Sequence, residues 1–141
     1  MNDDNAWAVG GVAGHAGLFS TASDVARLGQ EWLLAMESHG RILDPRVARE
    51  FARRDPTPGS ERALAWDTPS GEASSIGSKL GRGPLGAIGH LGYTGCSLWI
   101  DRDRRLVCAL LTNHVHPGGR RPAEMLAARR AFHDAVAKAV G

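Results

Sequence analysis

The apolar residues of this chain repeat at helical spacing in three separate stretches. The first stretch begins after Thr21, which forms a capping box with Asp24, and it ends at a glycine stop near residues 38–40. Residues three and four positions apart share one face of a helix, so the apolar positions predict its buried side. Those positions are Val25, Leu28, Trp32 and Met36.

The second predicted helix is shorter than the first, and the third is longer. Asp44 followed by Pro45 indicates an N-cap and a first-turn proline, with Val47 and Phe51 expected on the buried face. The last helix is predicted from Pro122 to about residue 140 and should pack across the sheet. Its expected apolar side consists of Met125, Phe132, Ala135, Val136 and Ala139.

The strongest strand signal is a pair of apolar segments, residues 96–101 and 106–112, on either side of a charged tight turn. This pattern predicts an antiparallel hairpin. The second segment is apolar throughout, so we expect both of its faces to be covered. A glycine-punctuated stretch, residues 86–95, leads into the hairpin and places His90 between two glycines at the mouth of a strand.

Two segments lack a regular period. Residues 1–19 carry too many glycines for a helix interior and are predicted as loop. Residues 67–88 are rich in glycine, serine and proline, and a loop of that length is typically functional or disordered. Because it ends close to His90, a cleft-lining role and a role as a mobile linker both stay open. Residues 63–66 are a candidate short strand.

The composition is that of one ordinary globular domain, with 43% hydrophobic and 23% charged residues and a net charge of +2. The basic residues are scattered without interleaved aromatics, so no nucleic-acid partner is expected. No apolar run approaches the ~20 residues of a membrane span. The polar, acidic residues 2–5 are the reverse of a signal peptide, and the localisation stays open.

Neither the cysteines nor the paired histidines form a metal-binding pattern. Cys96 and Cys108 lie on the two predicted hairpin strands, and we interpret them as half-buried thiols. Whether they face each other depends on the register of the hairpin. His114 and His116 share one side of an extended segment, but two imidazoles do not make a site. We therefore expect no metal and no other cofactor.

The chain also lacks the common sequence patterns of a serine nucleophile. No Gly-x-Ser-x-Gly elbow is present. Lys79 and Lys138, the two lysines, have isoleucine and alanine three positions before them, so no Ser-x-x-Lys occurs. His15 is interpreted as a loop residue that helps fix the backbone before the first helix. The remaining two histidines are interpreted as surface residues: His39 and His133.

Several blocks of sequence occur in a recognisable order. Residues 4–6 and 14–24 (Gly-His-Ala-Gly-Leu-Phe-Ser-Thr-Ala-Ser-Asp) are followed by residues 64–67 (Leu-Ala-Trp-Asp), and then by residues 89–101 and 110–113. In this order they resemble serine hydrolases of the β-lactamase and penicillin-binding-protein superfamily, of the class C β-lactamase-like or esterase-like kind. The resemblance covers nearly all of residues 1–141. It implies an α+β, partial β-lactamase/transpeptidase-like fold, with helices against an antiparallel sheet.

The resemblance also assigns roles to four residues. The third motif of the superfamily, Lys-Thr-Gly or His-x-Gly, lines one wall of the active site, and His90 matches its first position. His90 would bind the polar end of the substrate and assist proton transfer. Gly92 would leave room for the substrate, and the backbone N–H of Tyr93 would be an oxyanion-hole donor. Leu91 stands where threonine is common, which removes a hydroxyl contact to the substrate and puts a β-lactam or peptide substrate in question.

The implied reaction is acyl transfer to water from an ester, amide or lactam, with a small-molecule or peptide-like substrate. In the superfamily the nucleophile lies in Ser-x-x-Lys, upstream of the segment matched by Asp4. We therefore expect a C-terminal portion of one such domain, from a truncated or split gene, with no activity of its own. Members of the superfamily are often exported.

Two other hypotheses are kept. In one, the chain is a binding module whose open sheet edge docks on an N-terminal half, on a homologue or on a second copy. In the other, it is a free-standing enzyme that uses His15 or His90 with a different nucleophile.

Overall fold

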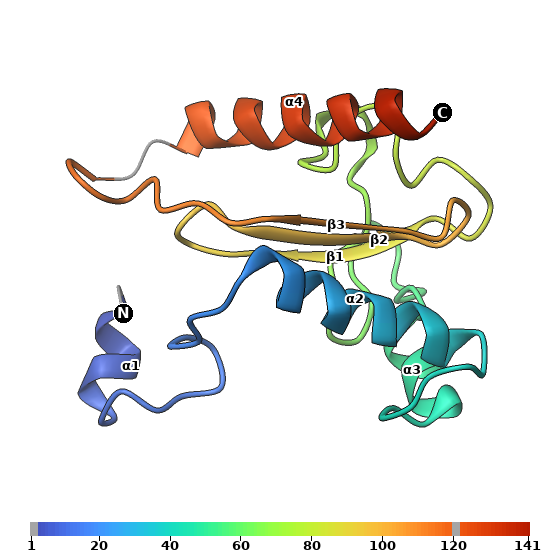
Figure 1. The fold of residues 1–141 in the computed structure, drawn as a ribbon, viewed down its shortest axis with the longest axis horizontal. Helices are drawn as coiled ribbons and strands as arrows, with labels where there is room; N and C mark the ends of the chain where they lie inside the picture. The colour runs from blue at the N-terminus through green and yellow to red at the C-terminus, as the bar shows by residue number, and fades with distance from the viewer. Residues whose placement is uncertain (1–2, 120–121) are drawn as a thin grey trace.

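A three-stranded antiparallel sheet lies between helices on both faces in the computed structural model, which describes residues 3–119 and 122–141 (Figure 1). The α+β class expected from the sequence is confirmed. The sheet has the order β1–β2–β3, and α4 covers one face while α2 and α3 lie on the other. The elements are α1 (Asp4–Ala8), α2 (Ala22–Met36), α3 (Pro45–Ala52), the 3-10 turn η1 (Gly71–Ala73), β1 (Ala87–Leu91), β2 (Ser97–Asp101), β3 (Leu106–Leu110) and α4 (Pro122–Val140). None of these helices is both long and apolar enough to cross a membrane.

The predicted helix starts are confirmed by their hydrogen bonds. Thr21 Oγ1 accepts from the backbone N–H of Asp24 at 3.2 Å, and Asp44 Oδ1 accepts from that of Arg46 at 2.8 Å. The end of α2 differs from the prediction. The backbone reverses at Ser38, whose φ is 68°, before the expected glycine stop is reached.

The predicted buried faces of α2 and α3 were partly wrong. Leu28 and Val47 are about half exposed, and the fully buried positions of the two helices carry small residues instead, with Leu33 the one large exception. The small residues are Gly29, Ala35, Ala48 and Ala52. A β-carbon on Gly29 would lie 2.6 Å from Val107 Cγ1 on β3, so α2 approaches the sheet where a large side chain has no room. Because the prediction considered only large apolar residues, it placed the buried face of each helix at a rotated position.

Two predictions for irregular segments also need correction. Residues 1–19 are not all loop, because Asp3 caps the short helix α1 by accepting from the N–H of Ala6 at 2.8 Å. The glycine-rich part begins only after this helix, at Gly10. Residues 63–66 do not form a strand: Ala63 makes an isolated bridge with Arg54, and residues 64–66 form a bend.

The predicted hairpin is confirmed as β2 and β3. Its register places Trp99 opposite Cys108, so Cys96 does not face Cys108, and both are free thiols. Cys96 is half-buried, as interpreted from the sequence, whereas Cys108 is buried. The preceding stretch adds a third strand, β1, with Gly89 opposite Trp99. A β-carbon on Gly89 would collide with the Trp99 ring. The glycine therefore leaves room for this ring to lie over β1.

Both faces of the sheet are packed, and each face has its own core. Alternation along β2 sends Leu98 and Ile100 toward α2 and sends Trp99 toward α4. The α2-side core consists of Leu33, Ala52, Ala63, Trp66, Ile88 and Ile100. The α4-side core consists of Ile76, Leu80, Ala87, Trp99, Cys108 and Ala137. β3 contacts both α2 and α4, which confirms that its two faces are covered, although as an edge strand it is only half-buried.

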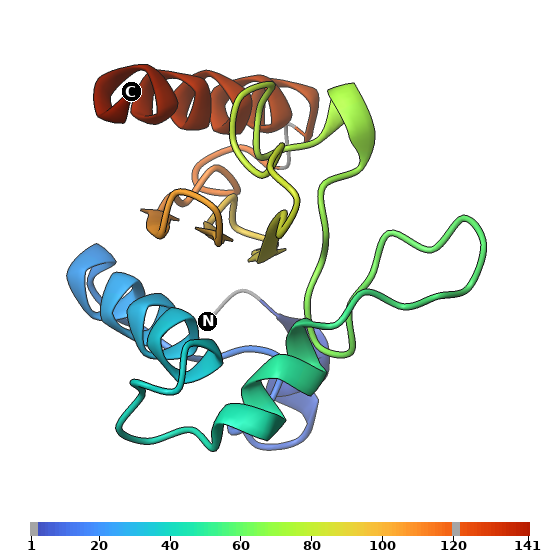
Figure 2. The same cartoon turned by 90° about the vertical axis from the view of Figure 1, so that its right-hand side faces the viewer.

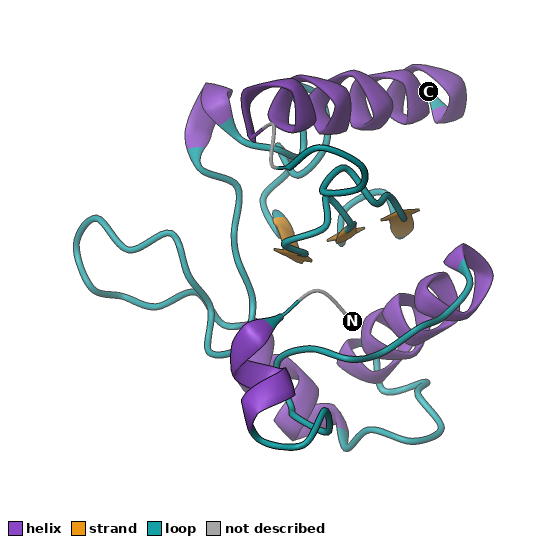
Figure 3. Ribbon diagram, turned by 90° about the vertical axis from the view of Figure 1, so that its left-hand side faces the viewer, coloured by secondary structure: helices purple, strands orange, loops and turns teal. Residues whose placement is uncertain are grey.

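The long loop before β1 is packed against the sheet. Figures 2 and 3 show the chain leaving α3, making a projecting loop and then passing the β1 edge to reach the α4 layer. Asp67 pairs with Gly89 through two backbone hydrogen bonds of 2.7 and 3.0 Å, and Ile76 and Leu80 are fully buried. These contacts favour the structured alternative for residues 67–88 over a mobile linker.

The inner face of α4 is partly polar, which the apolar pattern did not predict. Ala135 and Ala139 are exposed, and the residues facing the sheet follow a four-residue spacing. They are Met125, Arg129, His133 and Ala137. The surface interpretation of His133 is wrong: the side chain is fully buried on the inner face of α4, where Ser97 Oγ, at the start of β2, lies 3.2 Å from Nε2. His39 is exposed, as expected.

Burial of His133 makes the stability of the fold depend on pH. Desolvation is the main cause that lowers the pKa of His133 from 6.5 to about 4; the Asp134 charge raises it and the Arg129 charge lowers it. Between these values the unfolded chain binds more protons than the folded one. Stability should therefore be complete above pH 6.5 and fall toward pH 4, by at most about 3 kcal/mol from this residue.

Urea unfolding at a series of pH values measures this effect. The His133→Gln variant, which retains a hydrogen-bonding group for Ser97, should show a flatter dependence than the wild type between pH 6.5 and 4. His39→Gln, at an exposed position, is the control and should follow the wild type. Parallel curves for His133→Gln and the wild type would contradict the assignment.

Candidate active site

The four residues expected to form a wall are contiguous at the end of β1 and in the turn that follows. His90 and Leu91 close the strand, and Gly92 and Tyr93 open the turn. The N–H of Gly95 donates to Gly92 O at 3.0 Å, which closes a tight turn before β2 begins. The wall is therefore one short, continuous piece of backbone.

Alternation along β1 places His90 and Leu91 on opposite faces of the sheet. His90 lies opposite Leu98 on the α2 side, and Leu91 packs beside Trp99 on the α4 side. His90 is exposed, and its Nδ1 lies 3.0 Å from Leu91 O. A carbonyl oxygen only accepts, so Nδ1 carries the proton in this bond and Nε2 of the neutral ring is the acceptor. His90 can thus take up a proton or bind a polar group at Nε2.

The turn beyond Gly92 is packed against the segment that follows β3 and against α4. Gly95 has a φ of +99°, and a β-carbon there would lie 2.5 Å from Met125 Sδ and would also collide with Thr112. Thr112 Oγ1 and the N–H of His114 both donate to Thr94 O, at 2.9 and 3.0 Å. Only glycine fits at position 95, and the shape of the wall depends on it.

Arg129 on α4 contacts the same turn, and the sequence analysis did not single it out. Its Nε donates to Gly95 O at 2.9 Å, and its Nη2 donates to Gly92 O at 2.8 Å and to Cys96 O at 2.9 Å. Burial lowers the pKa of Arg129, although a guanidinium stays charged at any ordinary pH. The available signal was its spacing of four residues from Met125 and His133.

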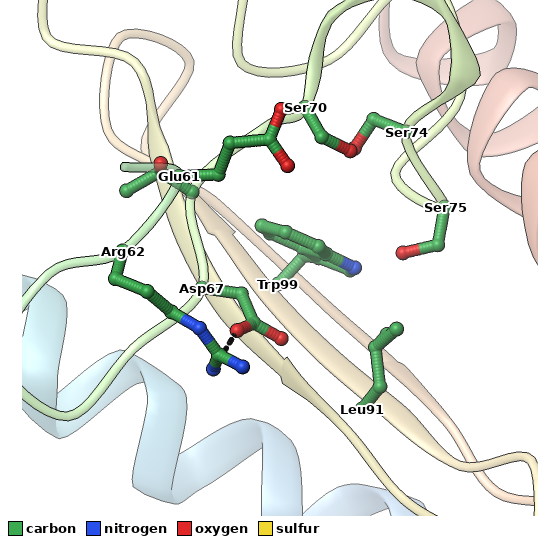
Figure 4. Close-up of a pocket in the computed structure, with 9 residues that line it drawn as sticks. Glu61, Arg62, Asp67, Ser70, Ser74, Ser75, Leu91 and Trp99 are labelled. Atoms are coloured by element: carbon green, nitrogen blue, oxygen red, sulfur yellow. Dashed lines mark hydrogen bonds and ion pairs between the residues drawn. The ribbon is translucent and has the colours of Figure 1, made fainter. Parts of the chain in front are cut away.

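A cavity of about 200 Å³ opens beside Leu91, between the sheet and the loop before it (Figure 4). It is lined by Glu61, Arg62, Asp67, Thr68, Ser70, Ser74, Ser75, Leu91 and Trp99. Arg62 and Asp67 form an ion pair at its rim. Trp99 Nε1 and Thr68 Oγ1 are buried and have no hydrogen-bond partner within the described part of the chain. The loop before β1 therefore lines a cavity that offers hydrogen-bonding groups next to the wall.

Other histidines considered from the sequence lie elsewhere. His15 Nε2 is 3.2 Å from Asp3 Oδ1, which ties the segment before α2 to the cap of α1. The pair formed by Ser97 and His133 has the atoms of a catalytic dyad, but both side chains are closed off from solvent and cannot reach a substrate. Over residues 3–119 and 122–141, no group of three potential metal ligands comes together.

Comparison with known proteins identifies the family. The family model described as Beta-lactamase matches residues 1–132. A protein of Salmonella agona (strain SL483) named "Putative D-alanyl-D-alanine carboxypeptidase" is 33% identical over 119 residues, which cover 82% of this chain and 27% of the relative. Proteins with the same name from Salmonella newport (strain SL254) and Salmonella dublin have the same identity and coverage. No solved structure matches the chain significantly.

The chain belongs to the beta-lactamase family, within the superfamily of serine hydrolases that includes the penicillin-binding proteins. It spans about a quarter of the length of these curated relatives. The resemblance carried by residues 14–24, 64–67 and 89–101 is thereby confirmed at the level of the family.

Proposed function

We propose that this chain forms the third-motif wall of a serine-hydrolase active site, in which His90, Leu91, Gly92 and Tyr93 meet the substrate. The observation that carries the proposal is the exposed His90, oriented by its bond to Leu91 O, next to the backbone of a tightly held turn. The reaction would be acyl transfer to water from an ester, amide or lactam. The names of the relatives favour a peptide-like substrate.

Within this site each residue has a separate task. Nε2 of His90 would bind the polar end of the substrate and exchange a proton with it. The backbone N–H of Tyr93 would donate to the oxyanion that forms when the carbonyl is attacked. Leu91 lies on the opposite face of β1 from His90, so it would contact only the part of the substrate that passes the β1 edge into the neighbouring cavity, and through apolar surface only.

The attacking serine and its base would come from residues other than these 141, because no Ser-x-x-Lys is among them. Without that serine no acyl-enzyme can form. We therefore expect the purified chain to hydrolyse nitrocefin and p-nitrophenyl acetate no faster than the same chain after heat denaturation. Turnover that a serine-directed phosphonate blocks would contradict this expectation.

Binding at the wall can be tested without turnover. Tyr93 is the only tyrosine, so labelling with 15N-tyrosine gives a single backbone amide signal. Titration with phenylphosphonate, a tetrahedral anion, should shift this signal, and His90→Ala should weaken the binding by about tenfold, as expected for loss of one charged hydrogen bond. His39→Ala is the matched control. A Tyr93 signal that does not respond to millimolar phenylphosphonate would overturn the proposed role of the wall.

A second function, as a docking module, is favoured by the exposed apolar residues before α2. Val12, Leu18 and Phe19 are 91%, 99% and 84% exposed. Single exposed apolar residues are ordinary, but three this open in one short segment are typical of an interaction site. β3 is also an edge strand, which offers backbone groups to another strand. The partner would be an N-terminal half of a related hydrolase or a second copy of this chain.

A measurement of self-association tests whether the chain docks on a second copy of itself. Size-exclusion chromatography with light scattering, at micromolar concentration, should show dimers or larger species for the wild type. The Leu18→Asp/Phe19→Asp double variant should shift them to monomer, because charge opposes burial of this segment. Leu85→Asp, at a half-exposed position in another loop, is the control. A clean, stable wild-type monomer would count against docking between copies.

A further inference from the structure

We propose that Arg129 is a positioning residue for the oxyanion donor, and that it acts by holding the peptide group between Gly92 and Tyr93 in one orientation. This inference rests on the proposed function of the wall and adds to it a residue from α4, 36 positions further along the sequence than Tyr93. It concerns the geometry of one N–H group.

The contacts of Arg129 enclose the turn from both ends. Nη2 donates to Gly92 O at 2.8 Å and to Cys96 O at 2.9 Å, and Nε donates to Gly95 O at 2.9 Å. All three acceptors are main-chain carbonyls, and they bracket Tyr93 on the chain. A planar guanidinium presents its donors in a fixed fork, so these bonds constrain the carbonyls relative to one another.

One of these carbonyls belongs to the peptide group that carries the proposed donor. Gly92 C=O and Tyr93 N–H are parts of the same planar, trans peptide, so they point in opposite directions. Fixing the oxygen on the α4 side therefore fixes the direction of the N–H on the other side. The N–H of Gly95 also donates to Gly92 O at 3.0 Å, and the oxygen is held by two donors.

The charge of Arg129 adds a second effect. A cation that donates to a carbonyl polarises the peptide, and this makes the N–H of the same group a stronger donor. The half-buried position of Arg129 reduces screening by water, which preserves the effect. Lysine at this position would keep the charge but lose the fork.

The test uses the same 15N-tyrosine label, and a second sample labelled with 15N-tryptophan provides the four indole N–H signals as reporters of the overall fold. Arg129→Gln should move the Tyr93 amide signal and weaken phenylphosphonate binding by about fivefold or more, while the indole signals stay in place. Arg130→Gln, with the same charge change one position along α4, is the control and should resemble the wild type. If Arg129→Gln does not fold, Arg129→Lys is measured in the same way.

The outcomes separate the inference from the proposed function. Unchanged Tyr93 signal and affinity in the Arg129 variant overturn the positioning role and leave the proposed function standing. A moved Tyr93 signal in that variant, with no phenylphosphonate binding by the wild type, supports the positioning role but rejects the function of the wall. Equal effects of the Arg129 and Arg130 variants also overturn the inference, because they indicate a general loss of charge on α4.

Discussion

The central strand β2 is buried on both faces, and this constraint determines where the helices and the other two strands pack. Leu98 and Ile100 require a cover on one side and Trp99 requires one on the other, so helices must pack on both faces. The strand also needs a hydrogen-bonded neighbour at each edge, and β1 and β3 supply them. Since the register of β1 against β2 sets His90 opposite Leu98, the packing of the core also fixes the position of the candidate site.

The features predicted correctly from the sequence are those determined by neighbouring residues. The N-caps of α2 and α3 depend on side chains two or three residues from the backbone groups they bind, and the hairpin depends on two apolar runs and a short turn. The family could also be recognised directly, because the blocks that carry the resemblance, such as residues 89–101, are contiguous strings. The roles of His90 and its neighbours within the third motif stay a prediction.

The features that the sequence did not predict depend on partners far along the chain. The buried face of α2 follows small residues because a strand 78 positions away, at Val107, lies against Gly29, and α3 in turn packs on α2. His133 is buried against β2, where Ser97 offers it a hydrogen bond, and Arg129 donates to carbonyls near Gly92. Spacing can place such a residue on the same helix face as Met125, but it does not reveal the partner, which belongs to another element.

The polar inner face of α4 has a consequence for how this helix can move. An apolar helix face on a sheet can slide by a turn and exchange one set of contacts for a similar one. Arg129 and His133 bind particular carbonyl and hydroxyl oxygens, so a shift of even one residue, about 1.5 Å along the axis, would leave buried polar groups unpaired. The C-terminal helix is thus locked to the sheet in a single axial register, and its docking and the geometry of the turn after β1 are gained or lost together.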